Sequence, residues 1–240
     1  MLFSIIVVAL NPGEKWKATL DSVFNQTWED YEIILKDGGS TDGSLDVWRG
    51  GHGAKLSGKD HASAETEKRY GPWNKVRYVD CADSGIYDAM NQAVSLASGR
   101  FLLFLNCGDL LADERVLERT AKFVRRQEEA GADLDRLILY GDTFSEKDRA
   151  VIASAPAVTG FTCYRNIPCH QSCFYGAALC RKKPYDLQYR IRADYDHFLW
   201  CFYQAGARIL HMSFPVSSYE GGGYSENCAN KERDRKEHKQ

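Results

Sequence analysis

The sequence predicts an α/β protein with a Rossmann-like, mostly parallel sheet flanked by helices. Strand-like and helix-like segments alternate through the first half of the chain, which is the order that builds doubly wound parallel sheets. The first strand-like segment, residues 4–10, is an unbroken apolar and β-branched run. Such a run is typical of a parallel strand that is covered on both faces.

The predicted elements of the first half follow in a regular order. Apolar residues recur at helical spacing from Trp16 to Phe24 and from Ile86 to Leu96, after which Gly99 acts as a stop signal. Residues 50–71 have no apolar pattern and predict a surface loop or an insertion. We expect strands at 4–10, 31–35, 76–79 and 101–105, and helices near 16–24, 44–49, 86–96 and 116–124.

The second half of the chain changes character. Its strand-like segments are short, and its most apolar helical segment has an aromatic face that includes Phe198 and Trp200. Residues 231–240 form a run of charged residues, which predicts a solvated or frayed tail. We expect strands at 137–140, 173–175 and 208–212, and a helix at 194–205.

Size and charge limit the classes of function. A chain of 240 residues can bury one sizeable core, so we expect a single domain over residues 1–230, with halves at 1–112 and 113–230. The formal net charge of -2 excludes a protein that binds nucleic acid by neutralising phosphates. No apolar run is long enough to span a bilayer, and the apolar N-terminus lacks a basic leader, so it predicts a strand rather than a signal peptide.

The eight cysteines predict buried, reduced thiols. No pair has the C-x-x-C spacing of a zinc ribbon or a thioredoxin-like site. Several cysteines, including Cys173 and Cys201, stand inside apolar or aromatic runs, where a free cysteine behaves as a small buried hydrophobe. This usage predicts a reducing, cytoplasmic compartment.

Four polar clusters follow predicted strands. They are Asn11, Asp37 with its glycine loop, Asp83, and the segment that ends in Asp109. Because ligands of an open α/β sheet bind outside the carboxyl ends of its strands, we expect these clusters to converge. The loop after Asp37 could equally be a turn that caps the next helix. Asp109 could belong to a simple turn, or it could hold Mg²⁺ together with substrate phosphates.

Three motifs carry a family resemblance. Residues 37–43 read Asp-Gly-Gly-Ser-Thr-Asp-Gly, residues 85–91 read Gly-Ile-Tyr-Asp-Ala-Met-Asn, and residues 104–109 read Phe-Leu-Asn-Cys-Gly-Asp. In this order and spacing they resemble the inverting glycosyltransferases of family 2, which have the GT-A fold. The resemblance runs from Ser4 to about Ser225, and it looks like the subgroup of bacterial colanic acid, exopolysaccharide and O-antigen transferases.

The resemblance implies a metal-dependent enzyme that uses Mn²⁺ or Mg²⁺. Such an enzyme moves a sugar from a nucleoside-diphosphate sugar to a hydroxyl of a glycan or lipid-linked glycan acceptor in surface polysaccharide synthesis. Residues 1–112 then form the half that binds the nucleotide sugar, and residues 113–230 form the half that binds the acceptor and holds the catalytic base. The implied location is the bacterial cytoplasm, with peripheral association at the inner face of the membrane as an option.

The resemblance also implies roles for individual residues. Asp194 matches the catalytic base, although Asp196 is a rival base and Asp194 could instead be a helix N-cap. Asp109 matches the metal ligand, and His170 and Gln171 fall on the acceptor side. Residues 221–225 match a glycine-rich loop that closes over the donor. The expected nucleotide-sugar-binding residues are Asn11, Asp37, Asp83, Asn91, Asn106 and Asp109.

Some positions depart from the family pattern. Gly38, Asn106, Gly108 and Ala193 stand where many members have acids. One alternative is therefore an inactive sugar-nucleotide-binding or glycan-binding module. A second alternative is a nucleotidyltransferase that makes sugar nucleotides, but its basic, glycine-rich loop is a poor match to residues 11–15.

Overall fold

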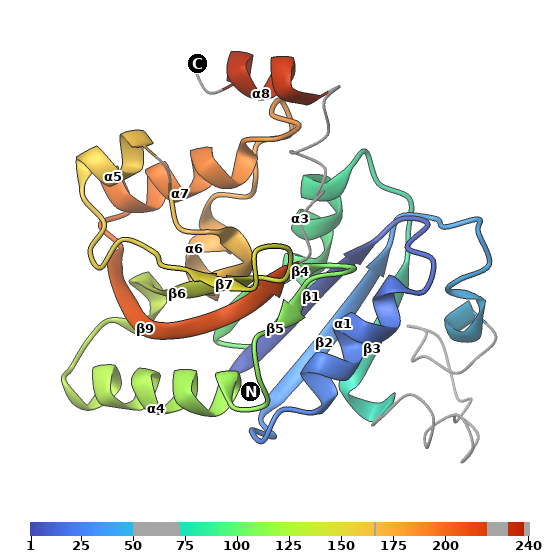
Figure 1. The fold of residues 1–240 in the computed structure, drawn as a ribbon, viewed down its shortest axis with the longest axis horizontal. Helices are drawn as coiled ribbons and strands as arrows, with labels where there is room; N and C mark the ends of the chain where they lie inside the picture. Colours follow the sequence, from blue (N-terminus) through green and yellow to red (C-terminus); the bar gives the residue numbers. More distant parts are fainter. Residues whose placement is uncertain (50–72, 166, 220–229, 238–240) are drawn as a thin grey trace.

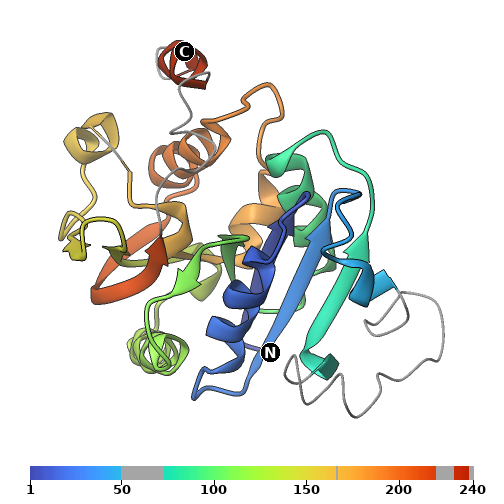
Figure 2. The ribbon, with the colours of Figure 1, turned by 45° about the vertical axis from the view of Figure 1, so that its right-hand side comes forward.

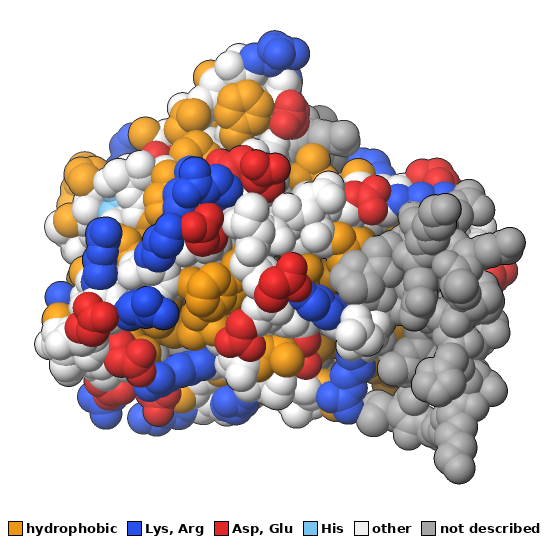
Figure 3. All heavy atoms as spheres, turned by 90° about the horizontal axis from the view of Figure 1, so that it is seen from below, with side chains coloured by type: hydrophobic (Ala, Val, Ile, Leu, Met, Phe, Trp, Pro, Cys, Tyr) orange, Lys and Arg blue, Asp and Glu red, His pale blue; other side chains and the backbone are white. Residues whose placement is uncertain are grey.

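A computed structural model describes residues 1–49, 73–165, 167–219 and 230–237. The predicted insertion at 50–71 and the glycine-rich loop at 221–225 lie outside these residues. Within the described ranges, no helix combines the length and apolarity that crossing a membrane requires. On the face drawn in Figure 3, the described acidic and basic side chains are interspersed and form no broad basic area.

Nine strands of the described chain form one sheet that runs through both predicted halves (Figure 1). The strand order is β3-β2-β1-β4-β8-β6-β9-β5, and β7 pairs with β6. The strands are β1 (Phe3–Ala9), β2 (Tyr31–Asp37), β3 (Val76–Asp80), β4 (Phe101–Asn106), β5 (Leu110–Leu111), β6 (Leu137–Ser145), β7 (Ala150–Ile152), β8 (Cys173–Gly176) and β9 (Arg208–Tyr219).

Helices cover both faces of this sheet. In Figures 1 and 2, α1 lies in front of the parallel strands and α3 lies behind them. The helices are α1 (Lys15–Phe24), α3 (Ile86–Leu96), α4 (Val116–Glu129), α5 (Gly160–Arg165), α6 (Ala177–Lys182), α7 (Ala193–Tyr203) and α8 (Lys231–Glu237). Single 3-10 turns are η2 (Trp73–Lys75), η3 (Leu134–Arg136) and η4 (His170–Ser172).

Strand β1 explains why its sequence is apolar at nearly every position. Phe3, Ile5 and Val7 belong to the core under α1 and α4, whereas Ile6 and Val8 belong to the core on the α3 side. Side chains alternate between the two faces of a strand, so a strand buried on both faces needs an apolar residue at each step.

The parallel register brings the predicted polar clusters to one edge of the sheet. Ala9 of β1 pairs with Asp37 of β2, and Val8 pairs with Asn106 of β4. Asp37 in turn pairs with Asp80 at the end of β3. The expectation that these strands end together is therefore confirmed.

The sheet is parallel only in part. The pairs β1–β2, β1–β4, β2–β3 and β6–β9 are parallel, but β8 joins both β4 and β6 in antiparallel orientation. The predicted doubly wound pattern thus ends after β4, and the second half is mixed. Strand patterns in the sequence give burial but not the direction of pairing, so they could not reveal this change.

The structure corrects the prediction for the C-terminal tail. Residues 231–237 form helix α8 rather than a frayed tail, and residues 238–240 lie outside the described residues. The carboxylates of Asp234 and Glu237 bind the chain segment 190–192. The charged segment was not predicted to be ordered, because its partners are polar groups distant in sequence. Such contacts leave no apolar pattern from which docking could be predicted.

Gly99→Ala should destabilise the fold. A Cβ at this position would lie 2.4 Å from the backbone nitrogen of Ser4 and 2.6 Å from the carbonyl carbon of Phe3, both in the central strand β1. We expect a loss of roughly 1–3 kcal/mol in the free energy of unfolding, measured by urea titration. Ser95→Ala, at an exposed position of α3, is the matched control. Equal stability of the two variants would contradict the close-approach role of Gly99.

Candidate active site

The Asp37 carboxylate lies beneath the glycine loop rather than in it. One oxygen accepts hydrogen bonds from the backbone of Gly39 and from the backbone and hydroxyl of Ser40, at 2.7–3.1 Å. The other accepts from Tyr78 at 2.7 Å and Arg49 at 2.8 Å. Burial opposes ionisation, but these hydrogen bonds lower the pKa of Asp37. Because its side chain is fully buried, Asp37 shapes the loop, and its direct contact with a nucleoside stays a prediction.

Asn11 ties the loop after β1 to the loop after β2. Its side-chain oxygen accepts from the backbone of Thr41 at 2.7 Å and of Asp42 at 3.2 Å, and its own backbone donates to Ser40 at 2.8 Å. Its φ of 48° is left-handed, a conformation that asparagine tolerates better than most residues. Asn11 therefore fixes the relative position of the two loops.

A buried ion pair stands beside this loop. The ammonium of Lys36 lies 2.9 Å from the Asp83 carboxylate, with side-chain exposures of 0% and 7%. A Cβ on Gly38 would come within 2.6 Å of an Asp83 oxygen. A side chain at position 38 would therefore have to displace the Asp83 carboxylate, which fills this space.

A cavity of about 680 Å³ opens at the carboxyl ends of β1 and β4, and we call it the strand-end cavity. Its volume falls in the range of small-molecule sites. It is lined by Val8, Ala9, Leu10, Pro12, Asp83, Ser84, Gly85, Ile86, Tyr87, Asp88, Ala89, Asn106, Cys107, Leu187, Tyr189, Arg190 and Arg233.

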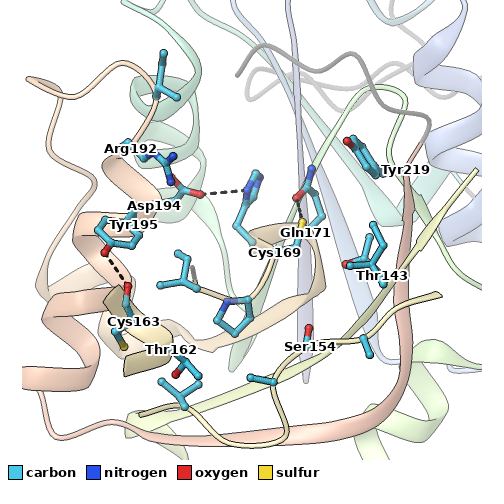
Figure 4. A pocket seen from close by; sticks show the side chains of 18 of the residues that line it. Thr143, Ser154, Thr162, Cys163, Cys169, Gln171, Arg192, Asp194, Tyr195 and Tyr219 are labelled. Atoms are coloured by element: carbon cyan, nitrogen blue, oxygen red, sulfur yellow. Dashed lines mark hydrogen bonds and ion pairs between the residues drawn. The ribbon is translucent and has the colours of Figure 1, made fainter. Parts of the chain in front are cut away.

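A second cavity, of about 590 Å³, contains the predicted base, and we call it the Asp194 cavity. It combines polar residues, among them His170, Gln171 and Asp194, with apolar residues such as Ile152 and Val158. Figure 4 shows Asp194 and Gln171 along one wall of this cavity, and Asp194 forms an ion pair with the imidazole of His170.

Asp194 is held by two partners. One of its oxygens lies 3.4 Å from Nδ1 of His170, and the other accepts from the Tyr87 hydroxyl at 2.8 Å. Burial opposes ionisation of Asp194, but the hydrogen bond and charge of His170 outweigh it and lower the pKa of Asp194. Burial lowers the pKa of His170, yet Asp194 raises it above its ordinary value. Because Tyr87 lines the strand-end cavity, this hydroxyl connects the two cavities.

Asp109 and Asn106 form the second polar centre. One oxygen of Asp109 accepts from the backbone of Asn106 at 3.0 Å and from the side chain of Gln171 at 3.2 Å. The side-chain oxygen of Asn106 is buried and has no hydrogen-bond partner. A carboxylate beside an unpaired amide oxygen fits a hard cation, which prefers oxygen ligands. The described residues contain no cluster of three or more acidic, histidine or cysteine ligands, so substrate oxygens would have to complete such a site.

The structure brings most of the predicted site residues together. Asp194 with His170, and Asp109 with Asn106 and Gln171, form the two polar centres described above.

Asn91 instead hydrogen-bonds the backbone of Tyr185 in both directions, at 2.9 and 2.8 Å, and supports the loop before α7. Sequence reasoning missed Tyr87, although it stands in the Gly-Ile-Tyr-Asp-Ala-Met-Asn motif of residues 85–91.

The structure shows how Asp194 and its rival Asp196 are placed on α7. The N-cap of α7 is Arg192, and no side chain caps this helix. The N-cap interpretation of Asp194 is therefore wrong, because Asp194 lies inside the first turn. Asp196 pairs with Lys183 at 2.6 Å rather than standing free in solvent.

The described cysteines do not form disulfides. Seven are free thiols, and Cys228 lies outside the described residues. Burial raises the pKa of Cys169 and of Cys201 to about 12, so both thiols stay protonated at neutral pH.

The geometry agrees with the comparison to known proteins. Residues 4–186 match the family described as Glycosyl transferase family 2. The chain belongs to this glycosyltransferase family. It is 34% identical, over 96% of its length and 82% of the relative's, to a PGL/p-HBAD biosynthesis glycosyltransferase of Mycobacterium tuberculosis. It is 28% identical, over 82% of its length and 67% of the relative's, to an uncharacterized glycosyltransferase of the same species.

Solved structures confirm the GT-A fold of this glycosyltransferase. S. aureus TarS 1-349 in complex with UDP has a TM-score of 0.66 at 20% identity, with coverage of 92% of this chain and 61% of that one. The mannosyltransferase PcManGT from Pyrobaculum calidifontis, in complex with GDP-Man and Mn²⁺, has a TM-score of 0.62 at 17% identity, with coverage of 92% and 58%. The chain spans 37% of the longer TarS structure.

His170 should titrate above its ordinary pKa of 6.5. In Asp194→Asn, burial outweighs the remaining charge of Asp109, so the pKa of His170 should fall. In Asp196→Asn it should stay high, because Asp196 pairs with Lys183. NMR titration of the imidazole measures all three proteins. Equal values in the wild type and Asp194→Asn would contradict the pairing.

The same shifts set a pH window for stability. The contribution of His170 to the free energy of unfolding is complete below about pH 6.5, the pKa of an unfolded histidine. It is lost as the pH rises through the higher pKa of His170 in the folded protein. The Asp194 contribution is present above about pH 4 and is lost as the pH falls through the lower folded pKa. The pair should therefore stabilise the protein most between about pH 4 and 6.5.

Proposed function

We propose that this protein is an inverting, metal-dependent glycosyltransferase that moves a sugar from a nucleoside-diphosphate sugar to an acceptor hydroxyl. The observation that carries this proposal is the position of the Asp194 carboxylate. It lies in one cavity and is linked through Tyr87 to a second cavity at the carboxyl ends of the strands. Two cavities linked in this way, with a base in one of them, suit a reaction of two substrates.

The strand-end cavity is the proposed donor site. Ligands of open α/β sheets bind at this edge, and the similar structures of TarS and PcManGT are complexes with UDP-GlcNAc and with GDP-Man. Asp83 and Asn106 line this cavity and are proposed to contact the donor, and so is Asp109, which lies beside Asn106 but outside the cavity lining. Asn11 and Asp37 would act indirectly, because they hold the two loops that border the site.

Asp109 and Asn106 are the residues that would hold Mn²⁺ or Mg²⁺, since both offer oxygen atoms. A bound cation would offset the negative charge that develops on the departing diphosphate. The complex of PcManGT with Mn²⁺ supports this choice. The orphaned oxygen of Asn106 is the feature of this chain that favours it.

Asp194 is the proposed general base. Its lowered pKa keeps it ionised at neutral pH, so it can accept the proton of the acceptor hydroxyl. The acceptor oxygen then bonds to the anomeric carbon while the bond from that carbon to the phosphate oxygen breaks, and the nucleoside diphosphate leaves. One displacement inverts the configuration. His170 is proposed to hold Asp194 in place, and Gln171 to line the acceptor side.

The acceptor is proposed to be a glycan or a lipid-linked glycan in the synthesis of a bacterial surface polysaccharide, in the cytoplasm or at the inner face of the membrane. The mixed lining of the Asp194 cavity, with Thr143 and Ser154 beside Ile152 and Val158, suits a sugar attached to an apolar group. The relative named for PGL/p-HBAD biosynthesis supports a role in glycoconjugate assembly.

An inactive binding module is the second candidate. Asn106, Gly108 and Ala193 favour it, because they stand where the family pattern that the sequence resembles has acids. The ionised Asp194 and its two hydrogen-bond partners argue for activity. Release of nucleoside diphosphate from a sugar nucleotide in the presence of Mn²⁺ separates the two candidates.

Asp194→Asn should reduce transfer by roughly 10²- to 10⁴-fold, because the amide cannot accept a proton at neutral pH. Donor affinity should change little, whereas loss of the ion pair with His170 should lower the melting temperature without unfolding the protein. Asp196→Asn, one helical step away and paired with Lys183, is the matched control. Measured turnover would refute the assignment if Asp196→Asn were inactive while Asp194→Asn kept its rate.

Asp109→Asn should weaken Mn²⁺ binding in the presence of nucleoside diphosphate by at least roughly 10- to 100-fold, the effect that even outer-shell changes produce. Asn keeps an oxygen for the hydrogen bonds that Asp109 accepts, so the fold should persist. Calorimetric titration of Mn²⁺ measures the change, with the exposed Asp135→Asn as control. Unaltered Mn²⁺ affinity would remove Asp109 from the metal site.

A further inference from the structure

Helix α8 lies across the chain segment that leads into α7, the helix that carries Asp194 (Figure 1). The Glu237 carboxylate accepts hydrogen bonds from the backbone N–H groups of Arg190, Ile191 and Arg192, at 3.0, 2.9 and 3.0 Å. Three consecutive backbone donors are thus satisfied by one side chain. The segment has these donors free because it precedes the first turn of α7.

A second contact fixes the same segment. Asp234 binds the guanidinium of Arg192 through two hydrogen bonds, at 2.7 and 2.9 Å, and each side chain is 25% exposed. Paired hydrogen bonds between a guanidinium and a carboxylate restrict orientation as well as distance. Arg192 is the N-cap of α7, so this contact restrains the start of the helix.

Ile191 is held from two sides. Its N–H donates to Glu237, and its carbonyl oxygen lies 2.5 Å from the hydroxyl of Tyr87. The same hydroxyl contacts Asp194. The position of Asp194 thus depends on contacts from α3 on one side and from α8 on the other.

We propose that α8 is a working part of the active site, in which Asp234 and Glu237 are positioning residues for Asp194. This inference rests on the proposed role of Asp194 as the base. A catalytic group displaced by about 1 Å can lose roughly 10²-fold in rate. The contacts of Asp234 and Glu237 with residues 190–192, which we call the α8 clamp, end two residues before Asp194, so they bear directly on turnover. Asp234 also lines the Asp194 cavity.

The same helix reaches the donor side. Arg233 lines the strand-end cavity together with Arg190, whose guanidinium bonds the Ser84 carbonyl oxygen. Two guanidinium groups beside the proposed donor site can offset the charge of a diphosphate. This matters because Asp109 is the one carboxylate in residues 104–109, so the protein offers a bound cation few acidic ligands. One helix therefore borders both substrates.

The test separates these roles by kinetics. Asp234→Asn and Glu237→Gln should each lower kcat by about 10-fold or more, with the Mn²⁺-dependent affinity for UDP or GDP unchanged. Arg233→Ala should instead weaken nucleoside-diphosphate affinity by roughly 10-fold. Controls are Asp186→Asn, whose carboxylate accepts hydrogen bonds from Gln188, and Arg125→Ala at an exposed position of α4. Melting temperatures confirm that each variant is folded.

A second readout does not need activity. Loosening the clamp should move the NMR-measured pKa of His170 toward the value in Asp194→Asn, because that pKa depends on the distance to Asp194. The positioning role is overturned if kcat and the His170 pKa of both variants match the control. The donor role is overturned if Arg233→Ala and Arg125→Ala bind nucleotide equally. A wild-type protein without transfer, but with the His170 response intact, would refute the proposed function and leave the clamp standing.

Discussion

The burial of β1 on both faces is the constraint on which the rest of the structure depends. Its side chains supply both cores, and its backbone pairs in parallel with β2 and β4 over nearly its whole length. Parallel pairing makes neighbouring strands end at one edge, where backbone and polar side chains meet. The loops after β1, β2 and β4 can then form a single wall, because none of them is free to shift along the sheet.

Hydrogen bonds connect the strand-end cavity, the Asp194 cavity and the Asp109 centre. Tyr87 connects the strand-end cavity to Asp194, and Gln171 connects the Asp194 cavity to Asp109. Each link joins a residue of the parallel half to a residue of the mixed half. Displacement of either half would therefore be felt at both polar centres, which would couple the proposed donor and acceptor sites without a separate domain interface.

Local features were predicted best from the sequence. Helix 86–96 matches α3 end to end, and the motif comparison assigned Asp194, His170, Gln171 and Asp109, which the structure gathers in two centres. What the sequence could not give is pairing between distant polar groups. The bond from Tyr78 to Asp37, the two bonds between Asn91 and Tyr185, and the docking of α8 involve partners far along the chain and have no periodic signature.

The contact between Gly38 and Asp83 bears on how this sheet edge can change over evolution. The space beside Lys36 holds a single carboxylate, and Asp83 provides it, so an acid at position 38 would add a second negative charge and a side chain where neither fits. Conversely, loss of Asp83 alone would leave the fully buried ammonium of Lys36 without its negatively charged partner. Positions 38 and 83 are thus expected to covary, with the acid exchanged from one strand end to the other in a paired replacement.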